Sequence, residues 1–207
     1  MGKKNMSNKQ DFHDSFLSEM PENLGDFELF DMIEYKIKKM SKNTSPIILD
    51  SGYKKIEGEK ILYYWYESND EIVIGIQLLK KPQTLIVNAV AKNPKYRRRP
   101  PYATELYKKV LDDNNNIRVM SDTYLSNSSV NTWKRLLNSG VNVSVYNNEN
   151  PGNSFLTIKN IEELEKYIGY DDDSDKYQFV ITSKDDILGE VTNHFNTRRL
   201  RELSGML

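Results

Sequence analysis

Three β-rich segments follow one another with very short links, and their close succession sets the fold class. The segments are Lys60 to Glu67, Glu71 to Leu79 and Thr84 to Lys92. β-branched and aromatic residues, which suit a pleated surface, dominate them. The link Ser-Asn-Asp at residues 68–70 predicts an antiparallel hairpin between the first two segments. Alternation places Tyr63 and Trp65 on one face of the sheet and Tyr64 and Tyr66 on the other.

Helical and strand patterns alternate after residue 93, which predicts a mixed α/β domain rather than an all-β one. The predicted helices are Tyr102 to Leu111, Ser129 to Leu137 and Ile161 to Ile168, and the predicted strands are Ile47 to Leu49, Ile117 to Met120, Val141 to Tyr146, Phe155 to Ile158 and Gln178 to Thr182. In the first of these helices Leu106, Tyr107 and Val110 are expected to face the core.

Extensions rich in apolar residues flank this domain. We expect residues 1–45 to form a polar tail and a helical extension, residues 46–182 the domain, and residues 183–207 a C-terminal helix. Apolar side chains recur at helical spacing in Phe12 to Met20, in Asp185 to Leu203 and in Phe27 to Met40. In the last segment Phe27, Phe30, Met32, Ile33 and Ile37 are predicted to share one face. These faces are expected to pack on the domain, on a partner protein or on a second copy of the chain.

Composition excludes several classes of site. Among 207 residues, Lys+Arg number 29 and Asp+Glu 30, for a formal net charge of -1, so no overall field draws the protein to nucleic acid or membrane. Cysteine is absent, and the two histidines, His13 and His194, stand in opposite tails. A disulfide framework, a histidine metal site and a Ser/His/Asp triad are therefore disfavoured. No apolar run is long enough for a membrane helix or a signal peptide, and a cytoplasmic protein is expected.

The link after the third β-rich segment reads NPKYRRRPPYATEL, from Asn93 to Leu106. A strand, a loop and a helix in this order form a common way to hold phosphate. Pro94, Tyr96 and Arg97, then Arg98-x-x-Pro101-x-Ala103, and finally Leu106 lie over the signature of one family. In this segment, and in the order of elements from residue 60 to residue 146, the chain resembles the GNAT family of acyl-CoA-dependent N-acyltransferases.

The resemblance implies a GNAT-like fold and acetyl-CoA as the cofactor. It implies that the backbone N–H groups of Val90 or Lys92 polarise the thioester. Carried over residue by residue, the phosphate-binding loop comprises Arg97, Arg98, Arg99, Tyr102 and Ala103.

The loop departs from the family where glycines would stand. Glycine lets backbone N–H groups approach a pyrophosphate, whereas Pro100 and Pro101 have no N–H to donate. Three consecutive arginines supply guanidinium groups that bind phosphate through their side chains. Two interpretations stay open: an arginine-based anion site, and a basic turn whose prolines begin the next helix.

The catalytic positions of the family also differ. Where a tyrosine commonly protonates the leaving thiolate, this chain has Trp133, whose indole is no useful acid. Tyr124 and Tyr146 are the nearest substitutes. Asn88 occupies the strand position of a general base and cannot serve, which leaves Asp122 as the best carboxylate. No metal is predicted, because the acidic run at residues 171–175 lacks the ligand spacing of a calcium loop.

These departures favour a GNAT-fold protein that has lost its catalytic activity and acts as a structural or interaction component of a larger assembly. In its lysine- and asparagine-rich composition and altered loop, the chain resembles GNAT-like proteins encoded by bacteriophages, which implies a place in the host cytoplasm or in a virion. The alternative is an acetyl-CoA-dependent N-acyltransferase that acts on an amine of a protein, a small molecule or a nucleobase. A third hypothesis is phosphate contact with nucleic acid through residues 97–99 and through Arg198, Arg199 and Arg201, which the neutral overall charge disfavours.

Overall fold

The computed structural model describes residues 25–115, 117–122, 125–149, 155–168 and 176–182. The expected helices at residues 12–20 and 185–203, the three C-terminal arginines and the acidic run lie outside these residues. The helices are α2 (Asp26–Ser41), α3 (Ala103–Asp113), α4 (Asn127–Asn138) and α5 (Ile161–Glu165), with short 3-10 turns at Asp50–Gly52 and Pro94–Tyr96. The strands are β1 (Ile47–Ile48), β2 (Tyr53–Glu57), β3 (Ile61–Ser68), β4 (Glu71–Lys81), β5 (Thr84–Lys92), β6 (Arg118–Met120), β7 (Asn142–Asn147), β8 (Leu156–Thr157) and β9 (Tyr177–Thr182).

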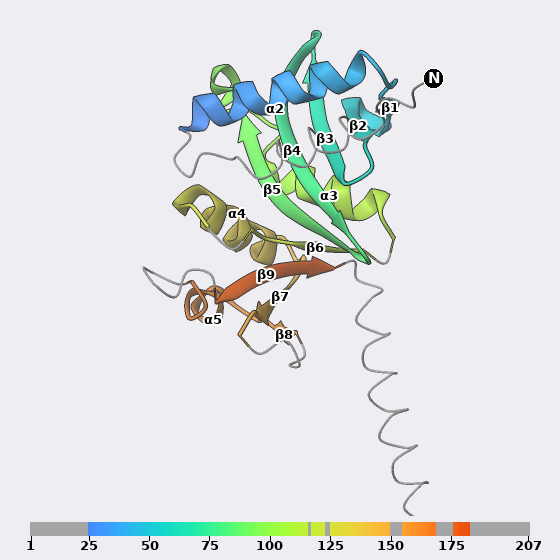
Figure 1. Ribbon diagram of the computed structural model, residues 1–207. Helices are drawn as coiled ribbons and strands as arrows, with labels where there is room; N and C mark the ends of the chain where they lie inside the picture. Colours follow the sequence, from blue (N-terminus) through green and yellow to red (C-terminus); the bar gives the residue numbers. More distant parts are fainter. Residues whose placement is uncertain (1–24, 116, 123–124, 150–154, 169–175, 183–207) are drawn as a thin grey trace, which may run out of the picture.

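Within the described residues the strands form one nine-stranded sheet in the order β1-β2-β3-β4-β5-β6-β9-β7-β8 (Figure 1). All neighbouring strands are antiparallel except β5 and β6, which are parallel. The mixed α/β class and the order of elements predicted from residue 60 to residue 146 are confirmed. The last strand, β9, inserts between β6 and β7, a pairing between distant segments that a local pattern cannot reveal.

The predicted hairpin between β3 and β4 is present. Ser68 pairs with Glu71, and the two intervening residues, Asn69 and Asp70, have φ of 51° and 59°. Asparagine and aspartate tolerate this left-handed conformation, and a two-residue turn of this kind matches the twist of the flanking strands. The local sequence thus explains the connection completely.

Strand β2 was not predicted, because its sequence YKKIE contains two adjacent lysines between glycine-bearing links. The structure pairs both lysines with carboxylates. Lys54 Nζ lies 2.8 Å from Glu67 Oε1 on β3, and Lys55 Nζ lies 2.6 Å from Asp113 Oδ2 at the end of α3. Asp113 also accepts a 2.5 Å hydrogen bond from the Tyr64 hydroxyl. These pairs let a charged segment serve as a half-buried strand.

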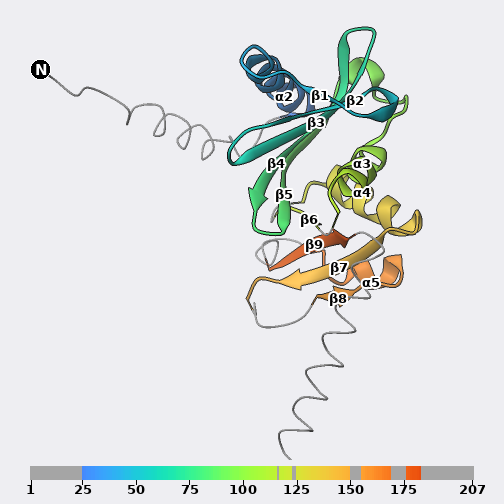
Figure 2. The same cartoon turned by 90° about the vertical axis from the view of Figure 1, so that its right-hand side faces the viewer.

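Helices cover both faces of the central strands. Figure 2 shows α2 on one side of β3, β4 and β5, and α3 and α4 on the other. Tyr63 and Trp65 pack with α2, whereas Tyr64 packs with α3 and α4, as alternation predicted. In α2, Phe30, Ile33 and Ile37 are buried, but Phe27 is 62% exposed. The prediction that Phe27 shares the buried face was therefore wrong; this residue lies in the first turn, beyond the covered part of the sheet.

A β-bulge in β5 changes which side chains face which helix. Gln77 pairs with Ala89 and Leu78 with Val87, so Asn88 is the extra residue. Before the bulge, Leu85 and Val87 pack on the α3 side; after it, Ala89 and Ala91 pack under α2. An extra residue inverts the two-residue period of a strand. Val90 consequently packs on the α3 side.

Gly75 in β4 allows α2 to approach the sheet closely. A Cβ at this position would lie 2.8 Å from Ile33 Cγ2 and 3.5 Å from Ile37 Cδ1. We expect Gly75→Ala to lower the free energy of unfolding by about 1–3 kcal/mol, because a tightly packed interface must shift to accept one more carbon. Urea denaturation measures this loss. The double variant with Ile33→Ala should lose less than the sum of the two single variants, and strict additivity would contradict the proposed clash.

Candidate functional site

A cleft opens where β5 and β6 separate. The two strands pair only from Thr84 to Ile86 on β5, opposite Arg118 to Met120 on β6, so among the described residues the remainder of β5 has no strand paired on that side. A cavity of about 330 Å³ lies at the end of β5. Its walls come from α2 (Phe27, Leu29), β4 (Ile74), β5 (Val90, Ala91, Lys92), the following loop (Pro94, Arg97), α3 (Ala103, Tyr107) and α4 (Ser128, Ser129, Thr132).

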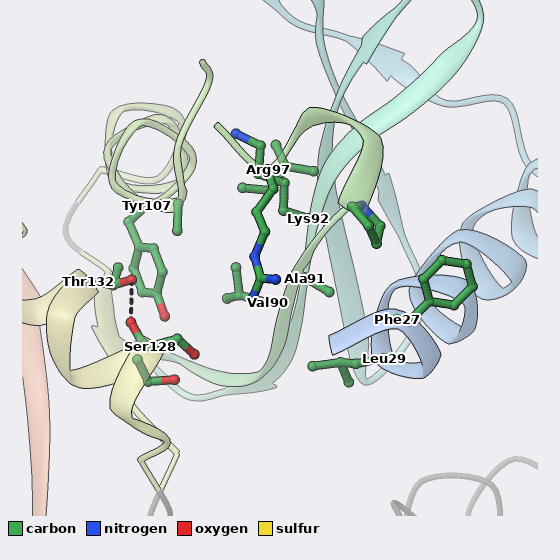
Figure 3. A pocket seen from close by; sticks show the side chains of 13 residues that line it. Phe27, Leu29, Val90, Ala91, Lys92, Arg97, Tyr107, Ser128 and Thr132 are labelled. Atoms are coloured by element: carbon green, nitrogen blue, oxygen red, sulfur yellow. Dashed lines mark hydrogen bonds between the residues drawn. The ribbon is translucent and has the colours of Figure 1, made fainter. Parts of the chain in front are cut away.

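Figure 3 shows how this cleft is arranged around Arg97. The Arg97 side chain runs toward Val90 and Ala91 at the base, with Tyr107, Ser128 and Thr132 on one side and Phe27 and Leu29 on the other. The cleft is therefore lined from both faces of the sheet. The wall on the α3 and α4 side carries hydroxyl groups, and the wall on the α2 side is apolar.

The backbone of β5 presents hydrogen-bond donors to this cleft. Asn93 donates a 2.9 Å hydrogen bond to the carbonyl of Val73, and the register pairs Ala91 with Gly75 and Lys92 with Ile74. In an antiparallel pair, residues alternate between bonding to the partner strand and pointing away from it. The N–H groups of Val90 and Lys92 therefore point away from β4, toward the separated edge. These are the two groups that the resemblance implied for polarising a thioester.

Most backbone N–H groups of the loop from residue 94 to residue 102 donate to oxygen atoms within the same segment. The N–H groups of Lys95, Tyr96, Arg97 and Arg99 donate to oxygen atoms of Asn93, Asn93, Pro94 and Tyr96, respectively. Pro94, Pro100 and Pro101 have no N–H, and the bond between residues 100 and 101 is cis. Phosphate binding by the loop backbone, as the family does it, is therefore strongly restricted.

The N-terminus of α3 already holds a carboxylate. The side chain of Glu105 accepts a hydrogen bond from the N–H of Tyr102, which caps the helix. An acidic side chain in the first turn satisfies the positive end of the helix dipole. A phosphate at this helix end would compete with Glu105.

The Lys92 side chain links the loop to the sheet through hydrogen bonds. Its ammonium group donates to the carbonyl oxygens of Arg99 and Pro101, the latter at 2.7 Å, and lies 4.6 Å from the centre of the Tyr102 ring. Partial burial lowers the pKa of Lys92 from its ordinary value. The lysine side chain thus positions the loop, while its backbone N–H faces the cleft.

The three arginines do not act as one group. All three are exposed, but of them Arg97 alone lines the cleft. Ala103 lines the cleft from the first turn of α3, and Tyr102, 36% exposed, donates its hydroxyl to the carbonyl of Arg98 at 3.2 Å. Among the five loop residues implied by the resemblance, the structure brings Arg97 and Ala103 to the cleft.

Of the three candidates for acid and base chemistry, the structure describes Asp122 and Tyr146. Tyr124 lies outside the described residues. Asp122 follows β6 and is half-buried, near enough to Tyr107 for its charge to affect that hydroxyl. Tyr146 on β7 stacks on Phe155, with ring centres 5.3 Å apart, and does not line the cleft. Asn88 donates a 3.2 Å hydrogen bond to Gln77 at the bulge.

Trp133 is part of the core. The side chain is fully buried, and its ring centre lies 5.6 Å from that of Tyr107 and 5.7 Å from that of Phe179. It supports Tyr107 from behind and does not line the cleft. The indole therefore contributes packing between α3, α4 and β9.

Tyr107 is the functional candidate that the sequence did not single out. Its side chain is only 4% exposed, yet it lines the cleft. Burial and the charge of Asp122 both raise the pKa of Tyr107, so the hydroxyl stays protonated and can donate. Helical periodicity predicted that this residue faces the core, and its ring is indeed buried. The same pattern cannot predict that the side chain also lines a cleft.

Across the described parts of the chain, no group of three or more acidic, histidine or cysteine residues could hold a metal ion. In the same parts, no helix is long and apolar enough to cross a membrane.

Comparison with known proteins gave two similar solved structures. One is the ribosomal-protein-S18-alanine N-acetyltransferase from Escherichia coli, at 11% identity and a TM-score of 0.38, covering 76% of this chain and 88% of that one. The other is a putative acetyltransferase of the GNAT family from Bacteroides thetaiotaomicron, at 11% identity and a TM-score of 0.38, covering 87% of this chain and 86% of that one. No protein-family model and no curated protein matches the sequence.

Proposed function

We propose that the protein binds an acyl-coenzyme A thioester in the cleft beside β5 and transfers the acyl group to an amine. The observation that carries this proposal is the pair of N–H groups, on Val90 and Lys92, that face the gap between β5 and β6. Backbone donors fixed by a sheet stabilise negative charge that develops on a carbonyl oxygen, because they need no reorganisation during the reaction.

The two walls of the cleft suit two different reactants. The polar wall on the α3 and α4 side would hold the coenzyme, which supplies an activated acyl group. The neutral Tyr107 hydroxyl is one of the donors on this wall. The apolar wall, with Phe27 and Leu29, leaves the opposite side for the amine. The acceptor is a protein, a small molecule or a nucleobase. Which of these it is depends on which amine can bind against the apolar wall.

The loop favours a second candidate, a protein that retains the fold without the reaction and acts as an interaction component. Its backbone donors are satisfied internally, and Glu105 occupies the N-terminus of α3. Under this candidate the helical extensions would contact a partner protein or a second copy. Binding of the coenzyme separates the two candidates.

Titration of the full chain with acetyl-CoA by calorimetry tests the proposal. We expect saturable binding at one site per chain, together with release of free coenzyme A in the presence of amines, lysine peptides or nucleosides. An active GNAT acetyltransferase run in parallel controls for the assay. Binding without turnover would favour the second candidate, and the absence of binding would reject the acyltransferase.

A further inference from the structure

A second cavity, of about 460 Å³, lies at the end of α2 opposite the cleft. The cleft is lined from the first turn of α2, whereas this cavity is lined from the C-terminal end, by Lys38 and Lys42 among others. Pro46, Lys54 on β2 and Trp65 on β3 supply further parts of its walls. Figure 1 shows this end of α2 beside β1, the outermost strand of the sheet. The cavity is therefore separate from the cleft and borders an edge of the sheet.

The cavity has an apolar floor with a matched pair of charges above it. Trp65 is buried in the floor, and its indole N–H donates a 3.1 Å hydrogen bond to Glu67. Glu67 also accepts a 2.8 Å hydrogen bond from Lys54, so the charges of these two residues balance one another. The remaining charge of the walls then comes from α2 and from Asp70 in the hairpin turn.

Lysines dominate the charge at this end of α2. From residue 34 to residue 42 the chain has four lysines against one glutamate, Glu34. Glu34 pairs with Lys38 at 2.8 Å, but an exposed ion pair one helical turn apart is weak and exchanges readily for another carboxylate. Lys38 and Lys42 are both exposed and both line the cavity. An incoming carboxylate is therefore favoured here over a cationic group.

Strand β1 has an open backbone edge beside this cavity. Among the described residues it is the terminal strand of the sheet and pairs with β2 alone. The N–H of Leu49 donates to Tyr53 at 2.8 Å, and bonding alternates along an antiparallel pair, so the N–H and C=O of Ile48 point away from β2. The side chains of Ile47 and Ile48 are 51% and 76% exposed. Such an edge is a template on which a further strand pairs.

The register of the strands connects the open edge to the lysines. Ile48 lies opposite Lys54, and Lys54 lies opposite Trp65, so these three side chains form one row on the α2 face of the sheet. Ile47 lies opposite Lys55, which bonds to the end of α3, and therefore belongs to the other face. A strand added beside β1 would continue both rows. Alternate side chains of that strand would lie beside the basic cavity, and those between them would lie beside Ile47.

We propose that β1 and the basic cavity bind an acidic segment of a partner protein as an added β-strand. The main chain of the segment pairs with Ile48, and its apolar side chains cover Ile47. Its acidic side chains extend across Ile48 to Lys38 and Lys42. The surface lies at the opposite end of α2 from the cleft, so its role is independent of acyl transfer.

Charge argues against a second copy of the chain as the occupant of this edge. Two β1 strands paired antiparallel about a two-fold axis would place the same face of each sheet on the same side. Lys38 and Lys42 of both copies would then lie on one side of the joined sheet and repel one another. Lysines and Pro46 beside an edge strand also discourage pairing with neutral strands. An acidic strand is the partner that these same residues favour.

The test measures binding of the full chain to a fluorescein-labelled peptide of alternating glutamate and valine, by fluorescence anisotropy at about 0.15 M salt, where distant charges are screened. Lys42→Ala should weaken binding about 3- to 10-fold, as for loss of one charged contact, and the double change with Lys38→Ala about 10- to 100-fold. Lys39→Ala is the matched control, because Lys39 is exposed on the same helix but does not line the cavity. It should change the dissociation constant less than about twofold.

Matched peptides separate the two parts of the recognition. Replacement of every glutamate with glutamine or with lysine should weaken binding about 10-fold or more, because the contacts with Lys38 and Lys42 are lost. N-methylation of alternate peptide amides, on the edge that pairs with Ile48, should weaken binding to a similar extent, because it removes main-chain hydrogen bonds. The three lysine variants change exposed positions, and equal melting temperatures would confirm that the fold is intact.

Each contrary outcome has a distinct meaning. Equal losses for Lys42→Ala and Lys39→Ala would replace the cavity with a diffuse basic helix. Equal affinity for the glutamate and glutamine peptides would overturn the acidic partner, and unchanged affinity of the N-methylated peptide would overturn strand addition. Binding of a single-stranded oligonucleotide but not of the peptide would assign the lysines to nucleic acid. A dimer in sedimentation that Ile48→Lys converts to a monomer would make a second copy the occupant, and binding of none of these probes would reject the surface.

Discussion

Replacement of Trp133 with alanine is expected to lower the free energy of unfolding by about 3–5 kcal/mol, the range for removal of a fully buried large aromatic side chain. The indole is 0% exposed and contacts the rings of Tyr107 and Phe179, which come from α3 and β9. Its loss leaves a cavity at the point where a helix, a second helix and the inserted strand meet. Chemical denaturation followed by circular dichroism measures the change.

Two variants make this result specific. Trp133→Phe keeps an aromatic ring and should lose less stability than alanine does. Arg135→Ala, on the exposed side of the same helix, should stay within about 0.5 kcal/mol of wild type. A Trp133→Ala protein as stable as the Arg135→Ala control would show that the indole is not a core residue.

The local patterns of the sequence predicted the parts of the fold that local chemistry decides. The turn at residues 69–70 requires residues that tolerate positive φ, and the aromatic residues of β3 alternate between two packed faces. Strand β2 was missed because its lysines look like a loop until their carboxylate partners, on β3 and α3, are known. Phe27 was assigned to a buried face because periodicity gives the direction of a side chain but not where the covering sheet ends.

The cleft was less predictable than the fold, because it depends on where β5 and β6 stop pairing. The separation of β5 from β6 follows from a three-residue pairing, and the bulge at Asn88 decides which β5 side chains face α3. Neither the short pairing nor the bulge produces a recognisable pattern in the sequence of a single strand. The arginines belong to a loop beside the cleft, but a run of three identical charges cannot indicate that Arg97 alone among them lines it. Glu105 and Lys92 explain the difference, because they fix the loop in place.

Replacement of Val90 with proline is expected to reduce acyl transfer about 100- to 1,000-fold, the effect of removing one donor to a developing oxyanion. The N–H of Val90 faces the gap beside β6, so its removal breaks no hydrogen bond with β4. Proline is tolerated where the N–H of a strand residue faces away from its partner. Release of free coenzyme A measures the rate, and Val90→Ala controls for loss of the side chain.

The neighbouring position provides the matched control for the strand geometry. The N–H of Ala91 faces β4, opposite Gly75, so Ala91→Pro should break a ladder hydrogen bond and destabilise the domain. Val90→Pro should instead melt close to Val90→Ala and lose activity. If Val90→Pro kept the turnover of Val90→Ala, its N–H would not be the oxyanion donor, and Lys92 would be the remaining candidate on that edge. If both proline variants unfolded alike, the assignment of donors to the two sides of β5 would be wrong, and the thioester would have to bind elsewhere in the cleft.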